Sequence, residues 1–292
     1  MYDLIVIGGG PGGLNCALYA ARYSLKVLML SDKPGGQMAY TSSIRNYLGY
    51  ENISGMELTN KFVKHVKKEG AEIKQEKVIS IEKGFTIQTN KGKYKSKSVV
   101  IATGANRKKL EGAEKFENKG VVYCATCDGP LYKNKVVAVV GGSNAAATTT
   151  LYLSDIAKKV YVIYRGKNLR SEAVLVKEID KRKNVKVFYD VNIKEFVGKT
   201  YLDKIILDNR KSLDVDGVFI EIGSTPASDI VKNLVKLNKG LVKVDKDLKT
   251  SLDGMYAIGD VVDTTGDFRQ ICISIAEGAM AARSVLEYLQ RK

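Results

Sequence analysis

Two cysteines separated by two residues, with an acid directly after the second, are the side chains of this chain best suited to chemistry. They are Cys124 and Cys127 in the string Cys-Ala-Thr-Cys-Asp that ends at Asp128. A cysteine pair at this spacing either opens and closes a disulfide or supplies two ligands to a metal ion. In the redox case the thiolate is the reactive form, so the adjacent carboxyl of Asp128 is a candidate for moving the proton.

A metal site lacks the ligands that it would need. A structural zinc site takes about four cysteine, histidine or acidic ligands, whereas the chain has one histidine, His65, and no second Cys-x-x-Cys. The two other cysteines, Cys16 and Cys272, stand in apolar helical patterns, and we expect both to be small buried side chains. The residues therefore favour redox chemistry, and we expect no metal.

A redox pair needs a source of electrons, and a nucleotide-binding pattern opens the chain. The apolar run 4–7 predicts a strand buried on both faces, followed by a helix to about residue 22. Between them Gly8, Gly10 and Gly13 fit G-x-G-x-x-G. This spacing allows a tight turn, brings the backbone close to a pyrophosphate and points a helix N-terminus at it. A second strand over 27–30 completes a βαβ unit.

Three further places could contact a bound dinucleotide. An acid usually follows the second strand and binds a ribose. Here Asp32 comes one residue late, after Ser31, so either Asp32 serves or the ribose is held otherwise. Gly36 and Gln37 follow another glycine, which lets the backbone pass close to a flat ligand. Asp260 ends an apolar strand and could accept a hydrogen bond from a sugar or ribityl hydroxyl.

A second βαβ unit repeats the plan with a weaker pattern. The apolar run 136–140 enters Gly141, and a strand over 160–164 follows the next helix. The middle glycine of the motif is replaced by Ser143, which restricts the approach of the backbone, and the last by alanine, which is accepted there. Arg165 and Arg170 follow the strand and could bind a 2′-phosphate, favouring NADPH over NADH. An ordinary cationic surface loop is the alternative.

Composition places these motifs in an ordinary water-soluble protein. At 292 residues, 45% hydrophobic and 27% charged, the chain is long enough for about two domains. No apolar run approaches the roughly 20 residues that span a membrane, and no signal peptide is evident, so we expect a cytoplasmic protein. The net charge of +15 is spread along the chain. It favours a solvated surface or steering of an acidic partner over binding of nucleic acid.

Together these motifs resemble the low-molecular-weight thioredoxin reductases, the class II group of pyridine nucleotide-disulfide oxidoreductases. The resemblance covers nearly the whole chain, in family order, and its specific element is the Cys-Ala-Thr-Cys-Asp string. It implies an α/β fold of two Rossmann-like three-layer (ββα) domains. An FAD domain (1–111 and 236–292) would receive an inserted NAD(P)H domain (112–235) that carries the cysteines. It also implies a homodimer, and a rotation of the small domain during the reaction.

The resemblance implies a role for each candidate residue. Cys127 would face the flavin, Cys124 would attack the partner disulfide, and Asp128 would act as acid and base. The partner would be thioredoxin or a glutaredoxin-like protein. The residues implied for FAD are Gly8, Gly10, Gly13, Asp32, Gly36, Gln37, Asn46, Ala102, Thr103, Gly104, Gly259, Asp260, Arg269 and Gln270. Those implied for NADPH are Gly141, Ser143, Asn144, Ala145, Arg165 and Arg170.

The chain departs from the family pattern around the second nucleotide motif. Ser143 replaces a glycine, Thr148 and Thr149 stand where the family often has paired acids, and Tyr164-Arg165-Gly166 replaces a histidine with paired arginines. The electron donor is therefore open: NADPH, or a reduced deazaflavin or ferredoxin as in some relatives. A redox-sensing flavoprotein without enzymatic activity is a further alternative.

Overall fold

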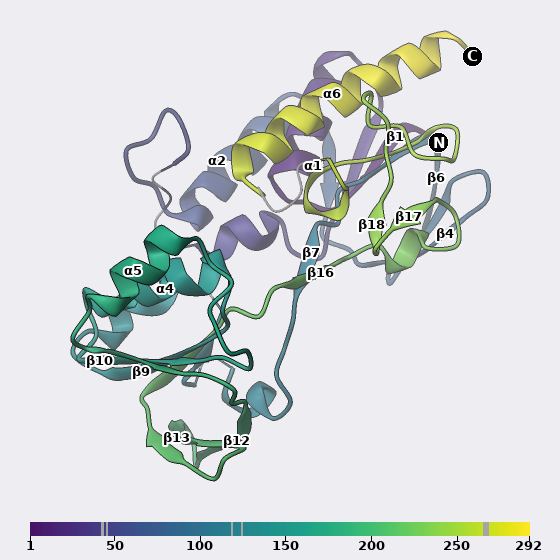
Figure 1. Ribbon diagram of the computed structural model, residues 1–292. Coiled ribbons are helices and arrows are strands. Elements are labelled where there is room, and N and C mark those ends of the chain that lie inside the picture. The colour runs from purple at the N-terminus through teal and green to yellow at the C-terminus, as the bar shows by residue number, and fades with distance from the viewer. Residues whose placement is uncertain (42–43, 45, 118, 124, 265–268) are drawn as a thin grey trace. The chain divides into compact units, whose positions relative to one another are not determined.

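The computed structural model describes residues 1–41, 44, 46–117, 119–123, 125–264 and 269–292, with only the backbone of residues 126 and 127 (Figure 1). The chain forms two compact units, Met1–Asn106 with Thr225–Lys292, and Arg107–Ser224. It crosses between them in β7 (Ala105–Arg107) and β16 (Ser224–Pro226), which pair with each other. Both boundaries expected from the sequence lie C-terminal to these crossings.

The first unit is built on a seven-stranded sheet in the order β3-β2-β1-β6-β5-β4, with β19 also paired to β6. The central strands β2, β1, β6 and β19 are parallel, whereas β4 and β5 form an antiparallel hairpin extension. The strands are β1 (Tyr2–Ile7), β2 (Val27–Leu30), β3 (Glu72–Lys74), β4 (Val78–Glu82), β5 (Thr86–Thr89), β6 (Lys93–Ile101) and β19 (Met255–Ala257).

The alternation of side chains along β1 divides the core of this unit into two layers. Leu4 and Val6 pack with α1 (Pro11–Arg22) and α6 (Ile271–Gln290) on one face of the sheet. Ile5 and Ile7 pack on the other face against β4 and β5 and against Val231 and Val235. Successive side chains of a strand point to opposite faces, so a fully apolar β1 needs cover on both. The third helix is α2 (Gly55–Lys68).

Glycines let the first and last helices cross at short distance. A Cβ at Gly278 of α6 would lie 2.3 Å from the carbonyl oxygen of Gly12 in α1. A Cβ at Gly12 would in turn lie 2.8 Å from the carbonyl oxygen of Ser274. Both approaches are too close for any other residue. The crossing therefore holds the N-terminus of α6 beside the N-terminus of α1, the part of the unit that follows the first glycine motif.

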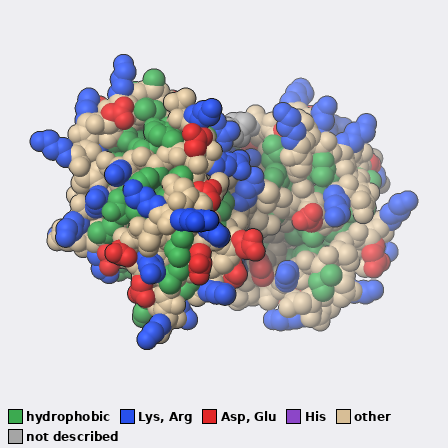
Figure 2. All heavy atoms as spheres, turned by 60° about the horizontal axis from the view of Figure 1, so that its bottom comes forward, with side chains coloured by type: hydrophobic (Ala, Val, Ile, Leu, Met, Phe, Trp, Pro, Cys, Tyr) green, Lys and Arg blue, Asp and Glu red, His purple; other side chains and the backbone are tan. Residues whose placement is uncertain are grey.

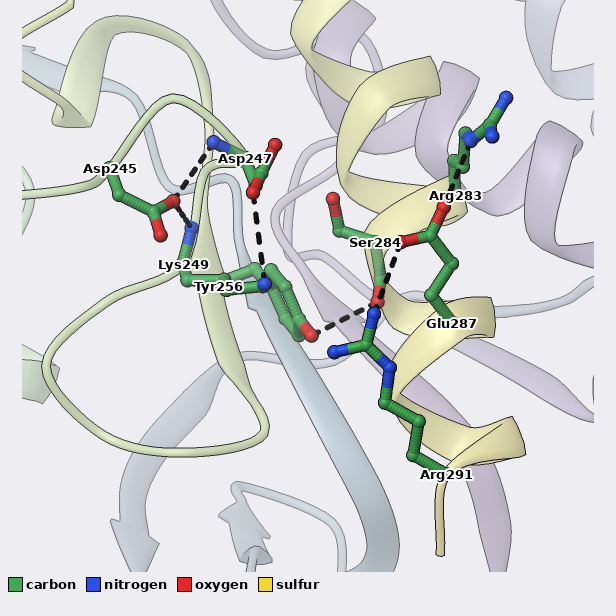
Figure 3. A network of polar contacts seen from close by, with 8 residues as sticks. All are labelled: Asp245, Asp247, Lys249, Tyr256, Arg283, Ser284, Glu287 and Arg291. Atoms are coloured by element: carbon green, nitrogen blue, oxygen red, sulfur yellow. Dashed lines mark hydrogen bonds and ion pairs between the residues drawn. The ribbon is translucent and has the colours of Figure 1, made fainter.

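The C-terminal half of α6 is fixed to the strand that precedes the Gly259 turn. Tyr256 of β19 is fully buried, and its hydroxyl donates a 3.1 Å hydrogen bond to the carbonyl oxygen of Ser284 in α6 (Figure 3). Burial raises the pKa of this tyrosine, which therefore stays a neutral donor. Before the strand, the carboxylate of Asp245 accepts the backbone N–H groups of Asp247 and Lys249, each at 2.9 Å. The Tyr256 bond therefore fixes β19 to α6, and the Asp245 bonds hold the turn before the strand.

The second unit repeats the architecture with a parallel five-stranded sheet, β11-β10-β9-β15-β8. Val137 and Val139 of β9 pack against α4, while Ala138 and Val140 pack against the antiparallel sheet β12-β13-β14. The strands are β8 (Val121–Val122), β9 (Val136–Val140), β10 (Lys159–Ile163), β11 (Val185–Phe188), β12 (Ile193–Gly198), β13 (Leu202–Leu207), β14 (Ser212–Asp214) and β15 (Gly217–Ile220). The helices are α3 (Ala125–Asp128), α4 (Asn144–Ser154) and α5 (Ala173–Asp180).

The remaining elements are short helical turns and two-residue strands. They are η1 (Gly36–Tyr40), η2 (Ala113–Phe116), η3 (Gly129–Tyr132), η4 (Asp229–Val231), β17 (Leu237–Asn238), β18 (Leu241–Val242) and η5 (Gly259–Val261). Both units thus have helices on one face of a parallel sheet and antiparallel strands on the other, which confirms the predicted α/β fold of two Rossmann-like three-layer domains. Within the described part of the chain, no helix has both the length and the apolar character that a membrane span requires.

Candidate functional site

The first glycine motif forms a cradle that only glycine can build. Gly8 has a φ of 113°, and a Cβ there would lie 2.1 Å from the carbonyl oxygen of Ala102. A Cβ at Gly13 would lie 2.0 Å from the carbonyl oxygen of Gly8, whereas a Cβ at Gly10 would meet nothing within 4 Å. Gly10 is also the N-cap of α1. The space over Gly10 therefore adjoins a helix N-terminus, where a phosphate is stabilised by unpaired N–H groups and the helix dipole.

Two neighbouring segments line this cradle. Gly36 lies against it, since a Cβ there would be 3.2 Å from the Cα of Gly10. The side-chain amide of Gln37 donates to the carbonyl oxygen of Ala105 at 2.7 Å, and the hydroxyl of Thr103 donates to that of Ala227 at 2.7 Å. These two side chains hold the backbone around the cradle. Gly104, with a φ of 68°, completes the predicted Ala-Thr-Gly turn at residues 102–104.

The acid expected to bind a ribose has an exposed side chain. Asp32 is exposed, and its carbonyl oxygen accepts the side chain of Gln75 at 3.1 Å. Ser31, the residue before Asp32, is buried beside the motif. A Cβ on Gly9 would lie 2.7 Å from the hydroxyl oxygen of Ser31. Ser31 thus packs directly against the motif.

The end of β19 and the start of α6 meet the same region. Gly259, with a φ of 75°, begins the turn that carries Asp260, and a Cβ on it would lie 3.4 Å from the hydroxyl of Ser274 in α6. Burial raises the pKa of Asp260, and the charge of Arg269 opposes that rise. At the N-cap of α6, the side chain of Gln270 accepts a 3.0 Å hydrogen bond from Asn46. The structure therefore brings together Asp260 with Arg269, and Asn46 with Gln270.

Glu277 is a residue of this region that sequence reasoning missed. Its buried carboxylate accepts the backbone N–H of Gly259 and the hydroxyl of Thr264, each at 2.5 Å. The carboxylate thereby fixes the turn that carries Asp260 to α6. The available signal was an acid within the otherwise apolar segment 271–282 of the last helix.

The second glycine motif differs from the first in what covers it. Gly141 has a φ of 143°, and a Cβ there would lie 2.2 Å from the carbonyl oxygen of Glu221. A Cβ on Gly142 would lie 2.4 Å from the ring of Tyr164, and one on Gly166 would lie 2.8 Å from it. The buried Tyr164 ring therefore fills the space beside Gly142. Ser143 is the N-cap of α4 but makes no side-chain capping bond.

The loop after β10 is tied to this second motif. Asn144 donates to the carboxylate of Glu172 and accepts the backbone N–H of Glu172, both at 2.8 Å. The N–H of Arg170 donates to the carbonyl oxygen of Gly142 at 2.7 Å. Arg165 and Arg170 have exposed side chains. The structure thus places the basic loop next to the motif, with Ala145 in the first turn of α4.

The redox motif begins at the carboxyl end of β8. Residue 124 lies outside the described residues, and the side chain of Cys127 is not described, so the structure gives no geometry for the sulfur atoms. The segment 125–128 forms the single turn α3. Arg107 donates from Nη1 to the carbonyl oxygen of Tyr123, directly before the motif. Burial raises the pKa of Asp128, and the charge of Arg107 opposes the rise.

Glu221, a second carboxyl that sequence reasoning missed, lies in the same unit as the redox motif. Glu221 follows β15 and accepts a 3.0 Å hydrogen bond from the hydroxyl of Thr149 in α4. Burial raises the pKa of Glu221, while the bond from Thr149 and the charge of Arg107 oppose the rise. The family pattern often has paired acids at the positions of Thr148 and Thr149. In this chain Thr149 instead donates a hydrogen bond to Glu221, an acid that follows another element. Only its place directly after the apolar run 218–220 could have drawn attention to it.

The two remaining cysteines differ in exposure. Cys16 is buried, as expected, and burial raises the pKa of its thiol to about 12. Cys272 is exposed, so the prediction that it is buried is wrong. It is the second residue of α6, where the helix begins and its apolar face is not yet covered.

Comparison with known proteins identifies the family. The family model described as pyridine nucleotide-disulphide oxidoreductase matches residues 2–281. The thioredoxin reductase of Ureaplasma parvum is 37% identical, over 100% of this chain and 98% of its own length. The crystal structure of Lactococcus lactis thioredoxin reductase has a TM-score of 0.86 and 32% identity, with full coverage of both chains.

A further solved relative is named as a ferredoxin-flavin thioredoxin reductase, from Clostridium acetobutylicum. It is 34% identical, with a TM-score of 0.53, and the alignment covers 100% of this chain and 99% of that one. The similarity therefore spans the whole length of these proteins. The chain belongs to the pyridine nucleotide-disulphide oxidoreductase family and, within it, to the low-molecular-weight thioredoxin reductases.

Proposed function

We propose that the chain is a flavin-dependent thioredoxin-disulfide reductase that passes electrons from NADPH through FAD to Cys124 and Cys127, and from them to thioredoxin or a glutaredoxin-like protein. The observation that carries the proposal is similarity to thioredoxin reductases over the whole chain, in a sequence that has a Cys-x-x-Cys followed by an acid. The sensor alternative shares the cysteines, but the three relatives described above are named as reductases.

The first unit would hold FAD. The open space over Gly10 fits a pyrophosphate, since the backbone there can approach it without meeting a Cβ. Asp260, at the turn fixed by Glu277, would accept a ribityl hydroxyl, and the N-terminus of α6 would favour a negatively charged ring. The other residues named above for FAD keep that role in the proposal. When bound, FAD accepts two electrons from a hydride donor and passes them to a disulfide.

The second unit would hold the donor nucleotide, with Gly141, Asn144 and Ala145 at the phosphates. Arg165 and Arg170 would bind the 2′-phosphate of NADPH, because both are exposed on the loop tied to the motif. Ferredoxin is the second candidate donor. It is favoured by the Tyr164 ring beside Gly142, which takes space at the motif, and by the relative named for ferredoxin.

The protein disulfide would be reduced by thiolate exchange. In the proposal Cys124 attacks the partner disulfide and Cys127 then closes the internal disulfide, which releases the reduced partner. Each attacking thiol must lose a proton and the leaving partner thiolate must gain one. Asp128 could carry that proton, because its burial raises its pKa and so keeps the protonated form accessible nearer to neutral pH.

Three properties of the assembly remain predictions of the family resemblance: a homodimer, the domain boundaries with rotation of the small domain, and a cytoplasmic location. The net charge of +15 would favour an acidic protein partner. Figure 2 shows lysine and arginine side chains spread over the visible surface among acidic and apolar ones. Steering would therefore be a general attraction, and it would weaken with salt because exposed charges are screened within about 10 Å at 0.1 M salt.

An anaerobic titration tests the donor. The FAD-loaded protein is mixed with NADPH, NADH or reduced ferredoxin in turn, and the visible flavin absorbance is followed. The proposal predicts bleaching by NADPH at the lowest concentration, followed by reduction of added oxidised thioredoxin. Bleaching by ferredoxin alone would replace NADPH by the second candidate. Bleaching without any reduction of thioredoxin would contradict the enzymatic function.

A further inference from the structure

The sheet of the second unit has one place where its strand order reverses. From β9 the chain continues through α4 to β10 and then to β11, whereas β15 and β8 lie on the other side of β9. In open parallel sheets of this kind, ligands bind outside the carboxyl ends of the strands at such a reversal. Glu221 is the first residue after β15, and its N–H donates to the carbonyl oxygen of Val140, the last residue of β9, at 2.8 Å. Glu221 therefore lies at this switch point.

Glu221 also adjoins the glycine motif. Its carbonyl oxygen would be 2.2 Å from a Cβ on Gly141, so the backbones of these two residues are in contact. Its carboxylate is held by the hydroxyl of Thr149, in the second turn of α4, at 3.0 Å. The side chain is thus fixed between β15 and α4, one strand away from the motif, in a defined orientation.

The two sides of the motif are chemically different. On the β10 side lie the basic residues Arg165 and Arg170, which suit the 2′-phosphate of the adenosine half of a dinucleotide. A dinucleotide with its pyrophosphate on Gly141 and its adenosine towards β10 extends its other half towards β15. That half is the nicotinamide riboside, which presents two ribose hydroxyls and a carboxamide N–H₂ as hydrogen-bond donors. The residue at the end of β15 is an acceptor.

The charge of Glu221 is partly compensated where it lies. Burial raises its pKa, and the hydrogen bond from Thr149 and the charge of Arg107 oppose that rise. The Thr149 bond occupies one of about four acceptor positions on an ionised carboxylate. A partly buried carboxylate with acceptor capacity left forms stronger hydrogen bonds to neutral donors than a solvated one does.

We propose that Glu221 binds the nicotinamide riboside half of the donor nucleotide by accepting hydrogen bonds from its ribose hydroxyls or carboxamide. The inference rests on the proposed role of the second unit as the nucleotide site. Thr149 is then a positioning residue, which aims the carboxylate. The assignment gives a role to Glu221, which follows β15, and to Thr149, one of the two threonines at which this chain departs from its family.

The test compares a whole nucleotide with a fragment of it. Binding of NADP⁺ and of 2′-phospho-ADP-ribose, which lacks the nicotinamide, is measured by calorimetry on the FAD-loaded protein. Glu221→Gln is expected to weaken NADP⁺ about tenfold, the range for loss of a charge-assisted hydrogen bond, and to leave the fragment within about twofold. Glu221→Asp should recover part of the loss, because it restores the charge on a shorter side chain.

Two controls separate this role from a structural one. Glu195→Gln removes an exposed acid from β12 of the same unit and should change neither affinity. Equal weakening of NADP⁺ and of the fragment by Glu221→Gln would overturn the inference, and so would an unchanged affinity for NADP⁺. If the unsubstituted protein bound neither ligand, the nucleotide donor itself would be refuted, and the role of Glu221 with it. Reduction of thioredoxin by another donor would show which proposal had failed.

Discussion

The backbone N–H of Gly259 lies 2.5 Å from the buried carboxylate of Glu277, which accepts its hydrogen bond. This bond joins the turn after β19 to the second turn of α6, 18 residues farther along the chain. A buried carboxylate is tolerated because it accepts two hydrogen bonds at once, the second from Thr264. The position of Asp260 in the proposed flavin site therefore depends on Glu277 as well.

Removal of this carboxylate should loosen the turn. Glu277→Ala leaves the N–H of Gly259 and the hydroxyl of Thr264 without their acceptor, so we expect a loss of about 2–3 kcal/mol in unfolding free energy. The FAD content of the purified protein should fall as well. Chemical denaturation and the ratio of flavin to protein absorbance measure the two effects. The control Glu287→Ala removes an exposed acid of the same helix and should change stability by less than about 1 kcal/mol.

The crossing of α1 and α6 should not accept a side chain. Gly278→Ala would place a Cβ 2.3 Å from the carbonyl oxygen of Gly12, which forces the helices apart and costs about 1–3 kcal/mol. A lower thermal midpoint and weaker FAD retention are expected together. Met280→Ala, at an exposed position two residues farther along, is the matched control. A Gly278→Ala protein as stable as the parent would contradict the short distance between α1 and α6 at this crossing.

Asp128 should control the pH dependence of thioredoxin reduction. Burial raises its pKa, so a proton-donating role is present below that raised value and is lost as pH rises through it. Asp128→Asn is expected to slow turnover at least about tenfold, within the range for general acid–base catalysis, and to remove this limb of the profile. The exposed Asp155 provides the control substitution Asp155→Asn. A profile of unchanged shape in Asp128→Asn would exclude the role.

Substitution of Arg107 should shift the Asp128-dependent limb of the pH–rate profile without abolishing it. Its charge lowers the pKa of both Asp128 and Glu221. Arg107→Gln therefore raises both pKa values, and the carboxyl limb of the pH–rate profile should move to higher pH. Arg107→Lys keeps the charge and should shift it less. A shift to lower pH, or none, would contradict the electrostatic role that the structure gives to this residue.

The strands and the first glycine motif could be predicted because their causes are local. Fully apolar runs such as 4–7 and 136–140 have few alternatives to a strand covered on both faces. In the first motif, Gly8 has a backbone angle that other residues rarely adopt, and Gly13 has no room for a Cβ. The amphipathic pattern of residues 55–70 predicts a helix, and the structure has one over Gly55–Lys68. The segment 270–289 likewise predicts a long helix, which is present as Ile271–Gln290.

The missed features depend on contacts between distant segments. Glu277 and Glu221 act through Gly259 and Thr149, and no spacing in the sequence links the members of either pair. The helix α5 was missed because its eight residues lie in a stretch that showed no clear start signal. The exposure of Cys272 depends on where α6 begins relative to its neighbours, which an apolar helical pattern does not determine.

The central claim is that electrons leave the protein through the cysteine pair. The most direct test measures reduction of oxidised thioredoxin by FAD-loaded Cys124→Ser and Cys127→Ser under anaerobic conditions, with flavin absorbance recorded alongside. We predict that both variants bind FAD and are bleached by the electron donor, while neither turns over thioredoxin. Sustained thioredoxin reduction by either variant would contradict the dithiol path.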